Sequence, residues 1–141
     1  MRAVIGYGSS IRGEDAFGLD VIKELQKLPL KETKLLSAHQ LTPETVLELQ
    51  DADEIIFIDT CHDEKNPYAL ACSLVEESTL NLSHHISPKT IIYMLRSLYS
   101  KNPHFYIYSM MSSSFDGITD IASYKKRVSM TAEHIVWVGG E

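Results

Sequence analysis

The chain has 141 residues, of which 44% are hydrophobic and 23% are charged, and its formal net charge at pH 7 is −6. This length and composition are ordinary for one folded domain with a single core, and they exclude extensive disorder. Only 13 residues are Lys or Arg, against 19 Asp or Glu, so the basic surface that nucleic-acid binding needs is missing. We expect residues 1–141 to form one domain, with a monomer favoured.

The sequence gives no sign of export or of membrane insertion. Met1 leads directly into an apolar strand pattern, and no apolar run approaches the roughly 18 residues that span a bilayer. The two cysteines, Cys61 and Cys72, show no CxxC spacing, so free thiols in a reducing compartment are the simplest interpretation. We therefore expect a cytoplasmic protein.

The first elements in chain order are a strand, a glycine-rich loop and a helix. The strand is the apolar run at 2–7, and the loop follows it directly. From Asp15 onward, apolar residues recur at three- and four-residue spacing until Pro29 stops the helix. The apolar positions of this helix are Phe17, Val21, Ile22, Leu25 and Leu28.

Strands and helices continue to alternate along the rest of the chain. The patterns predict a strand at 34–38, a helix after Thr42 and Pro43, a strand at 54–59, a weaker strand at 68–76, a helix opened by Ser87 and Pro88, a strand at 104–109, a serine-rich loop at 110–117 and a helix at about 120–138. Leu47, Leu98 and Ile121 are assigned to the apolar faces of their helices.

This alternation predicts an α/β fold: a three-layer, mostly parallel five-stranded sheet with helices on both faces. In such sheets the functional site lies outside the carboxyl ends of the strands. The loops after the first, third, fourth and fifth strands are therefore the candidates.

The first loop, GYGSSIRGEDAFG at residues 6–18, admits two interpretations. Glycines before a helix can hold a dinucleotide pyrophosphate. The third glycine, however, stands five residues after the second instead of three, and Glu14 and Asp15 occupy the place where a phosphate would approach. A nucleotide site is thus a weak alternative. Paired acids at a helix start suit a cation, or simply the helix dipole.

Two later segments carry further groups that can bind a metal or move a proton. Asp59 ends the third apolar strand, and His84 and His85 shortly precede the helix opened by Ser87. Alone, Asp59 is equally typical of a loop cap, and either histidine can be an exposed loop residue. If Asp59, one histidine and an acid of the first loop converge at one sheet edge, they form a mixed oxygen and nitrogen metal site. The sequence contains no GxSxG motif, which is a signature of a serine nucleophile.

These segments together resemble the hydrogenase maturation proteases. The glycine-rich opening motif of that family resembles GYGSSIRGEDAFG, and the link before its second helix resembles HQLTPE at 39–44. Its strand that ends in a metal-binding acid resembles residues 55–59, and its histidine motif resembles SHHISP at 83–88. The four segments span most of the chain in the family's order. The sequence departs from the family at Ser9, where the usual residue is Asn.

The resemblance implies an endopeptidase that removes the C-terminal extension of a nickel–iron hydrogenase large-subunit precursor after nickel insertion. It implies that Asp15, Asp59 and His84 bind nickel, with Asp15 and Asp59 as the catalytic carboxylates and with Glu14 and His85 as the alternative ligands one residue away. The nickel would be that of the precursor and not a permanent cofactor.

Two questions stay open at the level of the sequence. Nickel can act as a Lewis acid or water activator, or it can only dock the precursor while a carboxylate acts as base. The alternative function is a non-catalytic nickel-sensing module or chaperone for hydrogenase assembly, which would use the same ligands.

Overall fold

The computed structural model describes residues 1–8, 13–62, 68, 70–73, 86–112, 117–118 and 120–139, with the backbone alone at 14–15, 61–62, 70–73 and 137–139. Its elements in chain order are β1 (Arg2–Tyr7), the 3-10 helix η1 (Gly13–Ala16), α1 (Phe17–Leu25), β2 (Thr33–Ala38), α2 (Pro43–Leu49), β3 (Glu54–His62), β4 (Leu70–Ser73), α3 (Pro88–Tyr99), β5 (His104–Ser112) and α4 (Ile121–Gly139).

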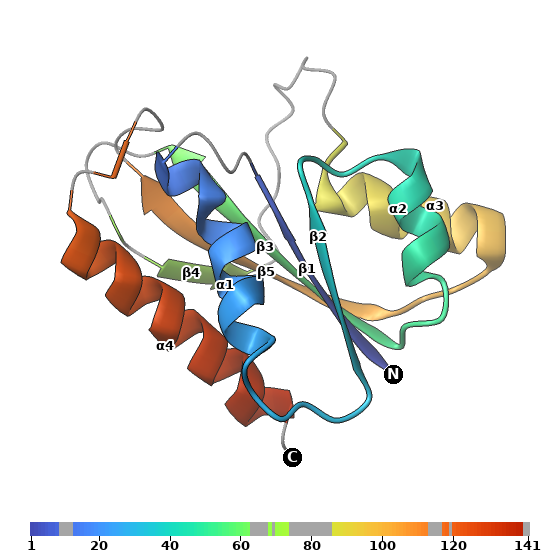
Figure 1. Ribbon diagram of the computed structural model, residues 1–141. Helices are drawn as coiled ribbons and strands as arrows, with labels where there is room; N and C mark the ends of the chain where they lie inside the picture. Colours follow the sequence, from blue (N-terminus) through green and yellow to red (C-terminus); the bar gives the residue numbers. More distant parts are fainter. Residues whose placement is uncertain are drawn as a thin grey trace.

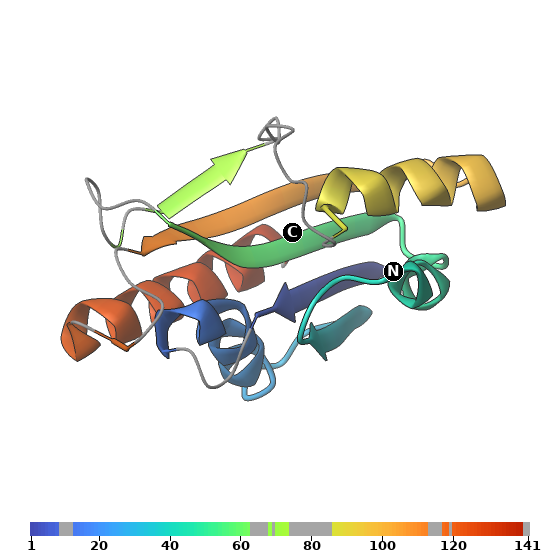
Figure 2. The same ribbon diagram turned by 90° about the horizontal axis from the view of Figure 1, so that it is seen from above.

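The strands form one sheet in the order β2-β1-β3-β5-β4. Strands β2, β1, β3 and β5 run parallel, whereas β4 pairs with β5 in the antiparallel sense. Figure 2 shows β3 between β1 and β5. The predicted α/β fold with a mostly parallel five-stranded sheet is therefore confirmed.

Two helices cover each face of the sheet, and alternate residues of each strand contribute side chains to a separate core on each side. Figure 1 shows α1 and α4 on one side and α2 and α3 on the other. Ile55 and Phe57 of β3 belong to the core under α2 and α3, and Ile56 and Ile58 belong to the core under α1 and α4. All four side chains are at most 1% exposed, as expected for a central parallel strand.

The first helix differs from its prediction at both ends. Its first turn is the 3-10 helix η1, and the α-helix ends at Leu25, four residues before Pro29. The amides of Lys27 and Leu28 donate to the carbonyls three residues earlier, so the chain leaves the helix through a tighter turn. Leu28 is 37% exposed and does not belong to the apolar face.

The third and fifth strands are longer than predicted. Their ladder continues past Asp59 and Ser109 to the pair His62 and Ser112. Ser112, which was assigned to a loop, is fully buried in β5. Each strand supplies backbone partners to the other, so the pairing continues where the apolar pattern stops. Of the weaker strand predicted at 68–76, the structure describes the strand Leu70–Ser73.

Three apolar residues assigned to helix faces are exposed instead: Leu47 at 54%, Leu98 at 67% and Ile121 at 57%. Leu47 follows the buried Val46 and therefore points about 100° away from it around the helix axis. Leu98 lies in the last turn of α3, where residues 96–98 are all exposed. Among the described residues, no helix is both long and apolar enough to cross a membrane.

Candidate functional site at the carboxyl edge

Polar side chains stand in one row at the carboxyl end of the three middle strands. Ser109 of β5 is the direct partner of Asp59 of β3. Tyr7 of β1 follows the paired residues Gly6 and Ile58, so it lies on the other side of Asp59. Their neighbours two residues earlier, on the same face of each strand, belong to the core under α2 and α3. The row therefore faces the α2–α3 side of the sheet.

Two hydroxyl groups hold the carboxylate of Asp59. The hydroxyl of Tyr7 donates to Oδ2 at 2.9 Å, and the hydroxyl of Ser109 donates to Oδ1 at 2.6 Å. Asp59 itself is partly buried and Ser109 is 4% exposed. Three adjacent strands thus contribute one side chain each to a single hydrogen-bonded unit.

The element that carries Asp15 lies next to this row. The 3-10 helix η1 contacts β3, and the loop before it starts with the amide of Gly8 donating to the carbonyl of Ala38 at 3.1 Å. The structure thus brings the 3-10 helix that carries Asp15 against the strand that carries Asp59. The side chains of Asp15 and Glu14 lie outside the described residues.

The glycines of the first loop serve close packing. A Cβ atom built on Gly18 would lie 2.5 Å from the carbonyl oxygen of Ile58 and 2.8 Å from the amide nitrogen of Tyr7. A Cβ on Gly13, which has a φ of +55°, would lie 2.6 Å from the Cα of Gly117 in the loop after β5. Glycine is therefore needed where α1 meets the sheet and where the first and last loops meet.

His84 and His85 lie outside the described residues, so their approach to the site stays a prediction, but the strand before them runs in the direction opposite to the other four. Because β4 is antiparallel, it ends toward the opposite edge of the sheet: Leu70 pairs with Met110, whereas Ser73 pairs with Ile107, further from the carboxyl end of β5. The description resumes at Ile86, whose side chain packs against the same core as Tyr7. His84 is thus two residues from a side chain on the face of Asp59.

The beginning of α3 agrees with its sequence signals. Ser87 is the N-cap, and its side-chain oxygen accepts a hydrogen bond of 3.2 Å from the amide of Thr90, while Pro88 occupies the first helical position. A serine cap followed by proline fixes where a helix starts. The segment that carries the two histidines therefore ends at a defined position.

Asp59 supplies a donor type that fits a divalent transition metal, and the other predicted ligands lie outside the described side chains. Carboxylate and imidazole groups bind nickel(II) well, and Asp59 presents a carboxylate with a fixed orientation. Among the side chains that the structure describes, no group of three or more His, Cys, Asp or Glu could hold a metal ion. The assignment of Asp15 and His84 as ligands stays a prediction.

Tyr7 and Ser109 are the two residues of the row to which the sequence analysis gave no role. Each is the last residue of its predicted strand, as Asp59 is. Polar residues that end three neighbouring parallel strands were the available signal, since such ends meet at one edge. The order of the strands, needed to see that the three are neighbours, comes from the structure.

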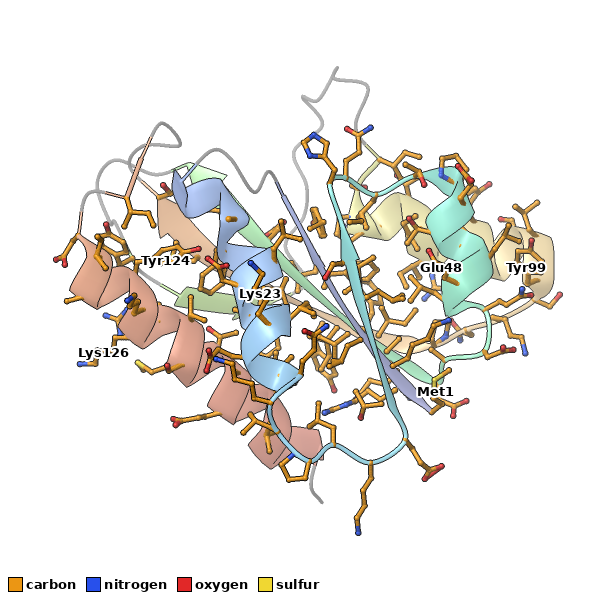
Figure 3. The ribbon with its side chains drawn as sticks, viewed as in Figure 1. Met1, Lys23, Glu48, Tyr99, Tyr124 and Lys126 are labelled. Carbon is orange, nitrogen blue, oxygen red and sulfur yellow. The ribbon has the colours of Figure 1, made fainter. Side chains whose placement is uncertain are left out.

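A separate groove of about 860 Å³ lies between α1 and α4. Figure 3 shows Lys23 and Tyr124 in this region. The hydroxyl of Tyr124 donates to Oδ2 of Asp20 across the two helices. The groove belongs to the other face of the sheet and contains none of the predicted site residues.

Comparisons with known proteins agree with the predicted fold. No protein-family model matches the sequence, and no curated protein matches it. Among solved structures, the chain is similar to a crystal structure of the nickel–iron hydrogenase maturation protease HycI from Thermococcus kodakarensis KOD1, with a TM-score of 0.78 and 16% identity over 99% of this chain and 92% of that chain.

Two further solved structures have the same architecture. The hydrogenase maturating endopeptidase HybD from E. coli aligns with a TM-score of 0.74 and 17% identity, covering 97% of this chain and 90% of its own. The hydrogenase 2 maturation peptidase from Thaumarchaeota archaeon SCGC_AB-539-E09 aligns with a TM-score of 0.68 and 16% identity, covering 97% and 96%. The chain thus has the fold that the sequence resemblance implied.

Proposed function

We propose that this protein is an endopeptidase that removes the C-terminal extension of a nickel–iron hydrogenase large-subunit precursor after nickel insertion. The observation that carries the proposal is the position of Asp59, held by two hydroxyls at the carboxyl edge of a sheet whose fold matches solved hydrogenase maturation proteases over nearly the whole chain. We further propose that the protein acts as a monomer in the cytoplasm.

The proposed site consists of Asp15, Asp59 and His84, with Glu14 and His85 as the alternatives. These residues would bind the nickel of the precursor, because carboxylates and imidazole suit nickel(II). Nickel in the precursor is part of the substrate, and when bound it can polarise a carbonyl group as a Lewis acid. An open site that the precursor completes would respond only to a nickel-loaded precursor.

The chain's own contribution to cleavage is a carboxylate near the scissile bond. Hydrolysis adds water to the carbonyl carbon, breaks the C–N bond and transfers a proton to the leaving amine. A positioned carboxylate accelerates this reaction by taking the proton from the attacking water. Asp15 and Asp59 are the candidates for this role.

The proposal is tested by mixing the purified protein with hydrogenase large-subunit precursors of its own organism, with and without nickel. Mass spectrometry follows the loss of a C-terminal peptide. We expect trimming only of the nickel-loaded precursor. Binding of the loaded precursor without trimming would reject the endopeptidase and support a nickel-sensing module instead.

The role of Asp59 is tested by Asp59→Asn, which keeps the shape of the side chain but removes its charge. We expect kcat/KM for the loaded precursor to fall by about 100-fold or more, the range found for a lost acid or base. Asp51→Asn makes the same chemical change at an exposed residue and should cleave like the wild type. Normal cleavage by Asp59→Asn would remove Asp59 from the site.

A further inference from the structure

We propose that Tyr7 and Ser109 are positioning residues that orient the carboxylate of Asp59 toward a divalent metal ion. This inference rests on the proposed function in one respect, because it takes Asp59 as a nickel ligand. It goes beyond that function by assigning a role to two residues that the proposed metal site does not include.

The geometry fixes both oxygens of Asp59 from opposite sides. Ser109 reaches Oδ1 from β5, and Tyr7 reaches Oδ2 from β1. One donor on each oxygen prevents rotation of the carboxylate about its last torsion angle, which is otherwise broad. The plane of the carboxylate is therefore set by the two strands that flank β3.

Both donors are themselves held in place. Ser109 is the ladder partner of Asp59 and is 4% exposed, so its hydroxyl has little room to turn away. The ring of Tyr7 packs against the core under α2 and α3, which fixes the position of its hydroxyl. Outer groups of this kind, which hold a metal ligand in one orientation, are a regular feature of metal sites.

The chemistry of the donors suits a metal ligand. A hydroxyl is neutral, so these two hydrogen bonds leave the negative charge of the carboxylate in place for a cation. Asp59 is partly exposed, so water could solvate it, and two fixed protein donors are not required for burial alone.

The test measures nickel binding without any precursor. Nickel(II) is titrated calorimetrically into the full chain as wild type, Tyr7→Phe, Ser109→Ala and Asp59→Asn. We expect nickel affinity to fall by about 10- to 100-fold in Tyr7→Phe and in Ser109→Ala, the usual effect of removing an outer-shell partner. Asp59→Asn should bind more weakly still.

Tyr108→Phe is the matched control. It removes a tyrosine hydroxyl from the residue next to Ser109, where that hydroxyl is 2.9 Å from Nδ1 of His134 and faces the α1–α4 side. Its nickel affinity should equal that of the wild type. Thermal unfolding of every variant shows whether it folds, and Tyr7→Phe, which loses one oxygen only, keeps the test decisive if Ser109→Ala is unstable.

The outcomes separate the two proposals. Wild-type affinity in Tyr7→Phe and Ser109→Ala, together with loss in Asp59→Asn, would overturn the positioning role and leave the endopeptidase standing. An equal loss in Tyr108→Phe would also overturn it, and so would the absence of nickel binding by the wild type. The expected affinity pattern in a protein that trims no precursor would retain the positioning role and reject the endopeptidase.

Discussion

At the scale of single residues, Gly18 determines how closely α1 approaches the sheet. A Cβ at this position would collide with the backbone of both β3 and β1, and backbone atoms cannot move aside as the end of a flexible side chain can. Glycine inside a helix is otherwise unfavourable by up to about 1 kcal/mol relative to alanine. The gain in packing must therefore exceed this cost.

We predict that Gly18→Ala destabilises the protein by about 3 kcal/mol, the upper range for forced overpacking, although helix propensity alone would favour alanine. Gly117→Ala is the control, because a Cβ there meets nothing within 4 Å, and we expect a change within about 0.5 kcal/mol. Urea denaturation gives both free energies of unfolding. A stabilised Gly18→Ala would disprove the close contact.

The residues of the candidate site show what single positions reveal and what they hide. Asp59 could be predicted because an acid directly after an apolar run is visible in one segment. Tyr7 and Ser109 could not, since their importance depends on lying beside Asp59 in a sheet whose order no single segment contains. The glycines were visible, but their role in close packing requires the partner backbone.

At the scale of elements, the start of α4 depends on Asp120. Its Oδ1 accepts a hydrogen bond of 3.1 Å from the amide of Ser123, and its Oδ2 accepts one of 2.9 Å from the hydroxyl of the same residue. These hydrogen bonds hold the pKa of Asp120 below its ordinary value of 3.8. A negative charge at this position also interacts favourably with the helix dipole.

A lowered pKa in the folded state means that the charged cap stabilises the protein above pH 3.8, and that this contribution disappears as the pH falls through the lower folded pKa. Asparagine caps a helix well but carries no charge. We therefore predict that the wild type has a higher melting temperature than Asp120→Asn at pH 6, and that this difference in melting temperature is smaller at pH 3. Asp51→Asn controls for net charge. A constant difference across this range would contradict the assignment.

The elements also show where local signals stop being sufficient. The N-caps Thr42 and Ser87, each followed by proline, located the starts of α2 and α3 correctly, because capping chemistry is local. The ends of β3 and β5 were placed three residues too early, since their last residues pair with one another and not with anything nearby in sequence. The reversed direction of β4 was likewise a property of its partner strand.

At the scale of the whole molecule, the two cores share one sheet. Ile55 and Ile56 are adjacent in β3, are at most 1% exposed and point into different cores. Any loss of packing on one face therefore acts on the same strand as a loss on the other. The two layers of helices should not unfold independently.

We predict that Ile55→Val and Ile56→Val each lower the free energy of unfolding by about 1 kcal/mol, and that the double variant loses about the sum, in one transition. Chemical denaturation followed by circular dichroism and by tyrosine fluorescence measures this, and the two signals should coincide. Met130→Leu, at an exposed residue of α4, should change little. Two separate transitions would mean that the cores are independent.

The strand order also determines when the sheet can close during synthesis. Strand β3 lies between β1, which the ribosome makes before it, and β5, which is made after it. Strand β3 contains the apolar run Ile55–Ile58. Until residue 112 has emerged, the edge of β3 that pairs with β5 in the finished sheet has no partner strand from β5. An apolar strand with an open edge readily pairs with other chains. Nascent copies of this protein should therefore be most prone to aggregation between the emergence of β3 and that of β5.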